Sequence, residues 1–364
     1  MPLPENDHAV GAIWIDVDNS PHVPLFAPII RYFRENSVDV IVTAREHSQT
    51  IELLDLAGFA GTYTMIGRHY GKGRLNKLRG LMVRSKQLIS NINDQGKGIS
   101  VAVSHGSRSM VLAARWLKIP VLTMYDYEFT ETGLFNRFSN HVLVPDAIPD
   151  PVLDEIGLPA GKRRKYPGLK EEVYLNSFHP DPGFRAGFLR THGHQNADTK
   201  VLATLRPPAT TANYHSDKGE VLFDDLLHLL LNAENVITVI VPRTHEQTAA
   251  IAERIANVAD VGQRCIVLDS AVDGLQLTFA SDLLISGGGT MNREAALLGV
   301  PVYSIFAGRQ GALDRAMENE GKITFIRDAR DLSKIRLERQ HHTEFPPLTD
   351  RVERFVIGEI EKFL

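Results

Sequence analysis

The sequence predicts an α/β protein made of two doubly wound, Rossmann-like domains that face each other across a cleft. Three observations predict this fold class. Short apolar segments alternate with longer helical segments along the chain, and this alternation is typical of parallel sheets. The apolar segments are nearly continuous, as expected of strands that are covered on both faces. The chain has 364 residues, which is the length of about two domains.

The first half of the chain carries the pattern of one such domain. Apolar runs predict its strands, and apolar residues three and four positions apart predict its helices. The expected strands span residues 12–17, 38–43, 62–66, 100–104, 121–125 and 141–144. The expected helices span 28–35, 49–57, 75–91 and 109–117. We assign residues 1–165 to this N-terminal domain.

The second half repeats the pattern. Its expected strands span residues 200–205, 236–241, 265–268, 283–285, 302–305 and 323–325, and its helices span 220–231, 245–256, 291–298 and 312–320. Proline, glycine and charged residues cluster in 166–198, which predicts a linker. Residues 199–345 form the expected C-terminal domain, and 346–364 an expected C-terminal helix.

Composition narrows the class of protein. A net charge of −4 argues against a general nucleic-acid-binding protein. The single cysteine, Cys265, excludes an intrachain disulfide and a cysteine metal cluster, and its apolar surroundings predict a buried thiol. No apolar run approaches the length of a membrane-spanning helix, and the N-terminus lacks a signal-peptide pattern. We therefore expect a cytoplasmic protein.

The segment from Ser286 to Pro301 carries the clearest functional signal. Gly287, Gly288 and Gly289 follow an apolar strand and precede a helix that begins near Thr290. A glycine turn at a helix N-terminus offers backbone N–H donors and a positive dipole end, which suits a phosphate. Glu294, in the first turns of that helix, has a carboxylate that can accept hydrogen bonds from ribose hydroxyls. The alternative is an ordinary strand–helix turn.

The loop after the first strand, from Asp16 to His22, admits three interpretations. Asp16 and Asp18 resemble the first motif of haloacid-dehalogenase-type phosphatases, but the paired aspartates that such enzymes need fall inside an expected helix here. Asp-Val-Asp also resembles a metal-binding motif of another glycosyltransferase fold, where the motif lies deep within its domain. The third interpretation is a positioning loop with His22 as a general base, against which stands a purely structural role for His22.

Other loops that follow strands add candidate ligand-binding residues. Tyr127 and Glu128 lie in a polar, aromatic loop that suits a hydroxyl-rich partner such as a sugar, unless the loop is merely solvated. Arg206 follows the first strand of the second domain, where its planar guanidinium suits a diphosphate or a surface ion pair. Gln310 and Asp314 follow a later strand and are within reach of sugar hydroxyls.

Residues 68–86 form a basic segment without any acidic residue, in which leucines and a methionine interleave with the cations. Such a helix suits an anionic membrane surface or an anionic acceptor. The alternative is a solvated face on an ordinary amphipathic helix.

With these motifs the chain resembles the GT-B superfamily of nucleotide-sugar proteins. In the N-acetylglucosaminyltransferase that makes lipid II, a small-residue turn precedes Thr, then Glu four residues on, then Gly-x-Pro; here these are Thr290, Glu294 and Gly299–Pro301. The resemblance implies that Glu294 binds the ribose of UDP. The first loop of that family matches only at His22-Val23, and its glutamine pair only at Gln310.

The non-hydrolysing UDP-N-acetylglucosamine 2-epimerases share the Ser-Gly-Gly turn, Glu-Ala and Leu-Gly-x-Pro, but their N-terminal loop is missing and their His-Arg-Arg loop is reduced to Arg206. From about residue 13 to 325 the chain is most similar to the prokaryotic family called domain of unknown function 354. Its features occur here at residues 15–23, 43–45, 52–54, 166–171 and 287–291.

The resemblance implies a GT-B glycosyltransferase of polysaccharide biosynthesis that needs neither a metal ion nor another cofactor. A nucleotide-diphosphate sugar, with UDP as the expected nucleotide, would lie on the second domain. A sugar or lipid-linked acceptor would lie on the first domain, with His22 or, as the alternative, Asp18 as base. Two other functions stay open. One is nucleotide-sugar epimerisation, and the other is nucleotide-sugar binding without catalysis in polysaccharide assembly. Peripheral contact with the inner face of a membrane through residues 68–86 also stays open.

Overall fold

The computed structural model describes residues 11–47, 49–68, 73–195, 199–208, 217–258, 260–270, 272–340 and 345–364. The chain divides into two compact units. Unit 1 contains Met1–Asn176, Gly311–Leu313 and Thr349–Leu364, and unit 2 contains Ser177–Gln310 and Asp314–Leu348. The division falls within the segment expected to be a linker, and the C-terminal helix belongs to unit 1.

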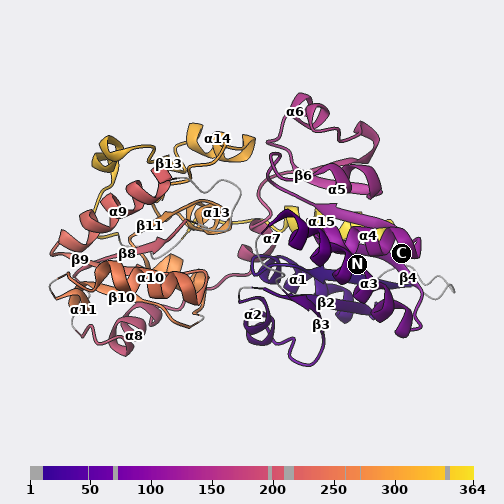
Figure 1. The fold of residues 1–364 in the computed structure, drawn as a ribbon, viewed down its shortest axis with the longest axis horizontal. Helices are drawn as coiled ribbons and strands as arrows, with labels where there is room; N and C mark the ends of the chain where they lie inside the picture. Colours follow the sequence, from indigo (N-terminus) through magenta and orange to yellow (C-terminus); the bar gives the residue numbers. More distant parts are fainter. Residues whose placement is uncertain are drawn as a thin grey trace. The chain divides into compact units, whose positions relative to one another are not determined.

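Unit 1 is a seven-stranded sheet in the order β3-β2-β1-β4-β5-β6-β7, and every strand pair in it is parallel. Figure 1 shows helices packed along the sheet. The strands are β1 (Ala12–Val17), β2 (Val40–Glu46), β3 (Thr64–Arg68), β4 (Ile99–His105), β5 (Val121–Met124), β6 (His141–Pro145) and β7 (Arg163–Tyr166). The helices are α1 (His22–Glu35), α2 (Thr50–Leu56), α3 (Arg74–Asp94), α4 (Arg108–Leu117), α5 (Gly133–Phe138), α6 (Asp150–Glu155), α7 (Glu172–Leu175) and α15 (Arg351–Glu361), with the 3₁₀ turn η1 (Ala160–Lys162).

Burial explains why these segments form strands. Every residue of β1 is buried, as expected for a central strand with helices on both faces. The edge strand β7 has the sequence Arg-Arg-Lys-Tyr, and only its tyrosine is buried. A search for apolar runs does not find such a strand, and the structure therefore adds a seventh strand to the six that were expected in the first half.

Unit 2 is a six-stranded, parallel sheet in the order β10-β9-β8-β11-β12-β13. Its strands are β8 (Val201–Arg206), β9 (Val236–Ile240), β10 (Cys265–Val267), β11 (Leu283–Ser286), β12 (Val302–Ser304) and β13 (Thr324–Phe325). Its helices are α8 (Phe184–Thr191), α9 (Asp217–Asn232), α10 (His245–Ile255), α11 (Val261–Arg264), α12 (Gly274–Ala280), α13 (Thr290–Leu297) and α14 (Ala312–Asn319, whose first two residues group with unit 1), with the 3₁₀ turn η2 (Ala329–Lys334). Cys265 is buried, and burial raises the pKa of its thiol to about 12, which makes it a poor nucleophile.

Two parallel, doubly wound α/β units confirm the predicted fold class. In such sheets ligands bind beyond the carboxyl ends of the strands, where the strand order reverses. That switch point lies between β1 and β4 in unit 1 and between β8 and β11 in unit 2. Candidate residues are therefore sought after these four strands.

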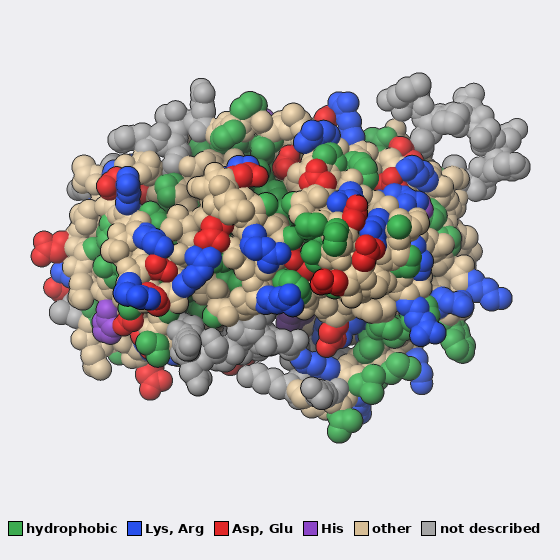
Figure 2. Space-filling model, turned by 90° about the horizontal axis from the view of Figure 1, so that it is seen from above, with side chains coloured by type: hydrophobic (Ala, Val, Ile, Leu, Met, Phe, Trp, Pro, Cys, Tyr) green, Lys and Arg blue, Asp and Glu red, His purple; other side chains and the backbone are tan. Residues whose placement is uncertain are grey.

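The surface charge is mixed. On the face drawn in Figure 2, Lys and Arg side chains lie among Asp and Glu side chains over both halves of the view. This distribution agrees with the small net charge of −4 and forms no extensive basic surface on that face of the kind that tracks nucleic acid.

Candidate functional site

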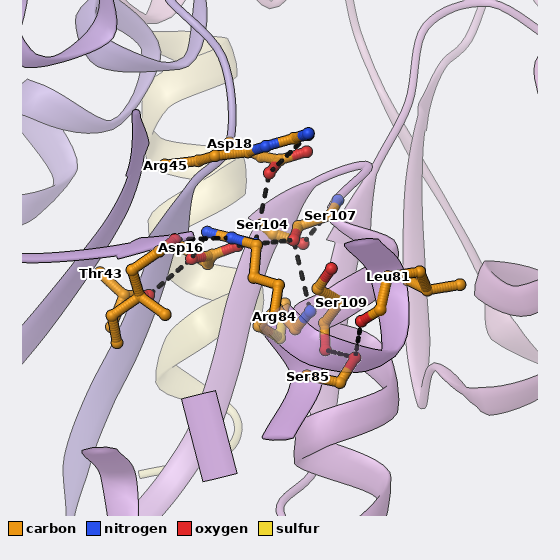
Figure 3. A network of polar contacts seen from close by, with 12 residues as sticks. Asp16, Asp18, Thr43, Arg45, Leu81, Arg84, Ser85, Ser104, Ser107 and Ser109 are labelled. Atoms are coloured by element: carbon orange, nitrogen blue, oxygen red, sulfur yellow. Dashed lines mark hydrogen bonds and ion pairs between the residues drawn. The ribbon is translucent and has the colours of Figure 1, made fainter. Parts of the chain in front are cut away.

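The first candidate residues lie at the switch point of unit 1, where Asp16 is the penultimate residue of the fully buried strand β1. The Asp16 carboxylate accepts hydrogen bonds from Nη2 and Nη1 of Arg84, at 2.8 and 2.9 Å, and from Oγ1 of Thr43 at 2.6 Å. Trp14 in turn donates to Thr43 at 2.9 Å. Figure 3 shows Arg84 reaching across from α3 to this carboxylate. The hydrogen bonds from Arg84 and Thr43 thus hold the Asp16 carboxylate in place near the end of β1.

Arg84 is the centre of this network. Its side chain is buried, and its Nη1 also lies 3.2 Å from Asp18 and 3.2 Å from the Ser107 hydroxyl. Its Nε donates to the carbonyl of Ile66 at 2.9 Å. A Cβ at Gly67 would come within 2.8 Å of Arg84 Cδ, so a glycine at position 67 leaves room for the buried guanidinium. Arg84 therefore joins β1, β3 and the N-terminus of α4.

Asp18, expected as an alternative base, is held in the same network. Its carboxylate lies 3.2 Å from Arg84 and 3.6 Å from Arg45, with 23% of the side chain exposed. Burial raises the pKa of Asp18, the two arginines oppose this shift, and Asp16 adds to it. Among the described residues, no group of three or more His, Cys, Asp or Glu side chains is placed to hold a metal ion.

His22 lies a few residues further along, as the first residue of α1. It is 8% exposed, and its ring centroid lies 5.0 Å from that of His105. Its Nδ1 is buried and has no hydrogen-bond partner among the described atoms. Burial, His105 and Lys170 lower the pKa of His22 well below its ordinary value, and Asp126 acts in the opposite direction. At neutral pH His22 is therefore an uncharged imidazole that can accept a proton.

Around His22 lies a cluster that we call the unit-1 cluster: His22, His105, Asp126, Lys170 and Glu171. Lys170 Nζ lies 2.6 Å from an Asp126 oxygen and also contacts Glu171. The other Asp126 oxygen lies 3.8 Å from His105 Nε2. His105 ends β4 and Asp126 follows β5, so a search of strand ends can find both. Lys170 lies in the segment expected to be a linker and gave no such signal.

The buried, neutral state of His22 predicts a pH dependence of stability. Its folded-state pKa is lower than its ordinary value of 6.5, so the unfolded chain binds the proton first as pH falls. The contribution of His22 to the free energy of unfolding should be fully present above pH 6.5. Below that pH the free energy of unfolding should fall by about 1.4 kcal/mol for each pH unit until the folded-state pKa is reached.

His22→Gln should flatten that decline, which urea denaturation at several pH values measures. His228, which is exposed on α9, provides the control, because His228→Gln should leave the decline as it is. An unchanged decline in the His22 variant would show that another group causes it.

Tyr127 and Glu128 were expected to contact a sugar. Glu128 is 1% exposed, and its Oε1 accepts a hydrogen bond from the backbone N–H of Ala312, in the same unit, at 2.7 Å. Tyr127 forms an edge-on contact with Phe129 at 5.6 Å between ring centroids. Glu128 thus supports the backbone at residue 312. Contact of Glu128 with a sugar stays a prediction and would be made in addition to this bond.

In unit 2 the three glycines of the phosphate turn have different roles. A Cβ at Gly287 would lie 2.6 Å from the Cα of Pro208, so the turn packs directly against the chain after β8. Gly288 has a φ of +94° and lies against Phe306. Gly289 has φ 95° and ψ −158°, a region that glycine alone occupies readily, and a Cβ there would meet no atom within 4 Å. The Gly289 side of the turn is therefore open.

Two arginines lie beside this turn. Arg206 ends β8 in register with Ser286 of β11, and Arg243 follows β9 and donates to the carbonyl of Pro207 at 3.3 Å. Burial and the charge of Arg243 lower the pKa of Arg206 to about 9, while Glu294 acts in the opposite direction. Two cations and one carboxylate thus influence one another at the switch point. Arg206 and Glu294 were expected here, and the structure brings Arg243 close to Arg206.

Gln310 and Asp314 are engaged within the protein. Gln310 donates to Glu318 at 2.8 Å, and Asp314 accepts from the buried Arg293 at 3.1 Å. Their expected contacts with sugar hydroxyls remain predictions, and such contacts would share or replace these bonds.

Comparisons with known proteins agree with this architecture. A sequence model of the family described as "Protein of unknown function (DUF354)" matches residues 11–343. The uncharacterized protein MJ0665 of Methanocaldococcus jannaschii is 25% identical over 335 residues, which cover 88% of this chain and 89% of that protein.

Among solved structures, the S. aureus MnaA–UDP co-structure has a TM-score of 0.72 at 13% identity and covers 97% of both chains. The UDP-GlcNAc 2-epimerase of Neisseria meningitidis bound to UDP-GlcNAc has a TM-score of 0.71 at 14% identity, with 96% of this chain and all (100%) of that chain covered. MurG of Acinetobacter baumannii has a TM-score of 0.51 at 15% identity, with 96% and 99% covered. At these identities the likeness establishes the fold, which is that of GT-B proteins.

Proposed function

This chain belongs to the DUF354 family, and we propose that it is an enzyme that takes a nucleotide-diphosphate sugar and transfers the sugar to an acceptor. The observation that carries the proposal is the group of Arg206, Arg243 and the Gly287–Gly289 turn at the switch point of unit 2. Two arginines and a glycine turn at a helix N-terminus form an arrangement suited to a diphosphate. Of the solved structures with this fold, S. aureus MnaA is in a co-structure with UDP, and the N. meningitidis epimerase is bound to UDP-GlcNAc.

In this proposal the donor lies on unit 2. The diphosphate rests on the open side of Gly289, at the positive end of α13, and its charges are met by Arg206 and Arg243. Glu294, in the second turn of α13, accepts hydrogen bonds from the ribose hydroxyls. The sugar then lies beyond the diphosphate, and Gln310 and Asp314 form hydrogen bonds with its hydroxyls.

The transfer step needs a base and a stabilised leaving group. The acceptor hydroxyl gives its proton to His22, its oxygen forms a bond to the anomeric carbon, and the bond from that carbon to the diphosphate oxygen breaks. The nucleoside diphosphate leaves with the electron pair. Arg206 and Arg243 offset the charge that develops on it, and oriented charges of this kind are a major source of transition-state stabilisation. His22 is neutral and can accept this proton, and its lowered pKa makes it a weaker base than an ordinary histidine.

The unit-1 cluster favours a second candidate, sugar epimerisation. Inversion at a ring carbon by removal and return of a proton needs more than one proton-transfer group, and His22, His105 and Asp126 lie together. The higher TM-score of the N. meningitidis epimerase, 0.71 against 0.51 for MurG, is in line with this candidate.

One experiment separates the two reactions. The protein is incubated with UDP-GlcNAc in heavy water, first without an acceptor and then with a panel of sugar and lipid-linked acceptors. A transferase releases UDP only with an acceptor and places no deuterium on the sugar. An epimerase yields a new sugar isomer that carries deuterium, without any acceptor. Binding without either product would identify a protein that holds the ligand and does not turn it over.

Variants test the residue assignments in the same assay. Glu294→Ala should weaken UDP binding by about 10- to 100-fold, since a hydrogen bond to a charged group contributes roughly 1.5–3 kcal/mol. Glu253→Ala, an exposed glutamate on α10, is the matched control and should bind UDP normally. Calorimetry measures both. Full turnover in His22→Ala would remove His22 from the role of base.

A further inference from the structure

The first half of α3 exposes large apolar side chains. Leu75, Leu78 and Met82 are 83%, 58% and 49% exposed. Their spacing of three and four residues places them along one side of the helix. Exposed apolar residues are ordinary when scattered singly, but a contiguous group of them marks an interaction surface.

From Arg74 to Lys86 the charged residues of α3 are all cations. Lys77, Arg79 and Lys86 are exposed beside the apolar residues, and no acidic residue occurs anywhere between positions 68 and 86. This is unusual in a chain with a net charge of −4. The second half of the helix is anchored differently, because Leu88 and Ile92 are buried in the core of unit 1. The first half thus presents an apolar and basic surface from a helix that is firmly packed at its other end.

We propose that the α3 patch, defined as Leu75, Lys77, Leu78, Arg79, Met82 and Lys86, binds the surface of an anionic lipid membrane. An apolar stripe flanked by cations is the pattern of helices that lie in the membrane interface, where the apolar residues reach the acyl boundary and the cations meet lipid phosphates. A second copy of the chain is a poorer occupant, because the same patch would bring its own cations against these. Among the described residues, no helix has the length and hydropathy needed to cross a membrane, so the contact is peripheral.

The position of the patch gives it a consequence for the proposed site. Arg84, two residues after Met82 on the same helix, is the side chain that binds Asp16 and Asp18. The helix that meets the lipid is therefore also the helix that fastens the loop after β1. The lipid proposal itself stands on the exposed residues of α3 and does not require the proposed sugar chemistry.

The test is co-sedimentation with lipid vesicles at low salt, without any sugar substrate. The protein should bind vesicles that contain phosphatidylglycerol and phosphatidylcholine and should not bind vesicles of phosphatidylcholine alone. Binding should weaken as salt rises. Lys77→Gln/Arg79→Gln/Lys86→Gln should reduce binding by about fivefold for each charge removed. Leu75→Ser/Leu78→Ser/Met82→Ser should reduce it by at least about tenfold, since apolar burial contributes to interfacial binding.

Val221→Ser is the matched control, because Val221 is a 62% exposed apolar residue on α9 of unit 2. It should bind vesicles like the parent. Thermal melting of each variant checks folding, and exposed positions should leave the melting temperature unchanged. Equal binding of the parent and both triple variants, or no binding to anionic vesicles, would overturn the proposal. So would a dimer in size-exclusion chromatography that the serine variant dissociates, because the patch would then be covered by a second copy.

Discussion

Arg84→Met should lower the free energy of unfolding of unit 1 by about 3–5 kcal/mol, the cost of removing one partner from a buried ion pair. Asp16 is completely buried, and without Arg84 its carboxylate keeps the hydrogen bond from the Thr43 hydroxyl. The variant also loses the bonds that Arg84 makes to Ile66 and Ser107. The result is a buried charge whose desolvation the Thr43 hydrogen bond offsets only in part.

Tryptophan fluorescence during urea denaturation can measure this loss in unit 1 alone. The chain has two tryptophans, Trp14 on β1 and Trp116 on α4, and both belong to unit 1. Trp14 is the better reporter, because it is buried and donates to Thr43, the neighbour of Asp16.

Two controls distinguish a buried pair from a surface pair. Lys97 and Asp39 form an exposed pair, with 46% and 64% of their side chains accessible, so Lys97→Met should cost less than about 1 kcal/mol. The double variant Asp16→Leu/Arg84→Met removes both buried charges and should lose less than Arg84→Met alone. Similar losses in Arg84→Met and Lys97→Met would mean that the buried pair has no special role.

The contrast between Asp16 and Arg84 shows what could be predicted from the sequence. The loop from Asp16 to His22 and the turn from Gly287 to Glu294 follow apolar strands within a few residues, and a local pattern is enough to find them. Arg84 lies 68 positions after Asp16, in a helix whose basic residues look alike. Which of these basic residues reaches Asp16 depends on how α3 packs against β3 and α4. That packing is a property of the tertiary structure and cannot be seen in the local sequence.

Other differences have the same cause. β7 is a polar edge strand, so hydrophobic pattern does not indicate it. Lys170 is buried between Asp126 and Glu171, although proline, glycine and charge in its neighbourhood suggested a solvated linker. The contact of Glu128 with the backbone of Ala312 was likewise not foreseen, while its proposed sugar contact stays a prediction. Residue type suggests what a side chain can do, while its partners are fixed by chain segments distant in sequence.

Arg206→Met should abolish most of the thermal stabilisation that UDP gives, without lowering the melting temperature of the free protein. The electrostatics of Arg206 explain why the melting temperature of the free protein should not fall. The pKa of Arg206 is about 9 in the folded protein against 12.5 for an ordinary arginine, so its charged form costs folding free energy at neutral pH. Removing the charge therefore removes a cost in the free protein. A diphosphate bound beside Arg206 and Arg243 would offset the same cost.

Differential scanning fluorimetry with and without UDP measures both effects. At a UDP concentration of about 100 times the Kd, the parent should gain roughly 2.7 kcal/mol from binding. Loss of a charged hydrogen bond of about 1.5–3 kcal/mol would remove roughly half to nine-tenths of that gain at the same concentration. Arg190→Met, an exposed arginine on α8 of the same unit, is the matched control and should keep the full response.

The two readouts separate a ligand-binding arginine from a structural one. A structural Arg206 would lower the melting temperature of the free protein when replaced, and the response to UDP would survive. A ligand-binding Arg206 gives the reverse, a free protein of equal or higher melting temperature that no longer responds. The reason is that a partly buried cation next to a second cation is unfavourable in the free protein, and the charge of the ligand compensates for it. The proposed diphosphate site therefore predicts that the stability of the free protein and its affinity for UDP change in opposite directions.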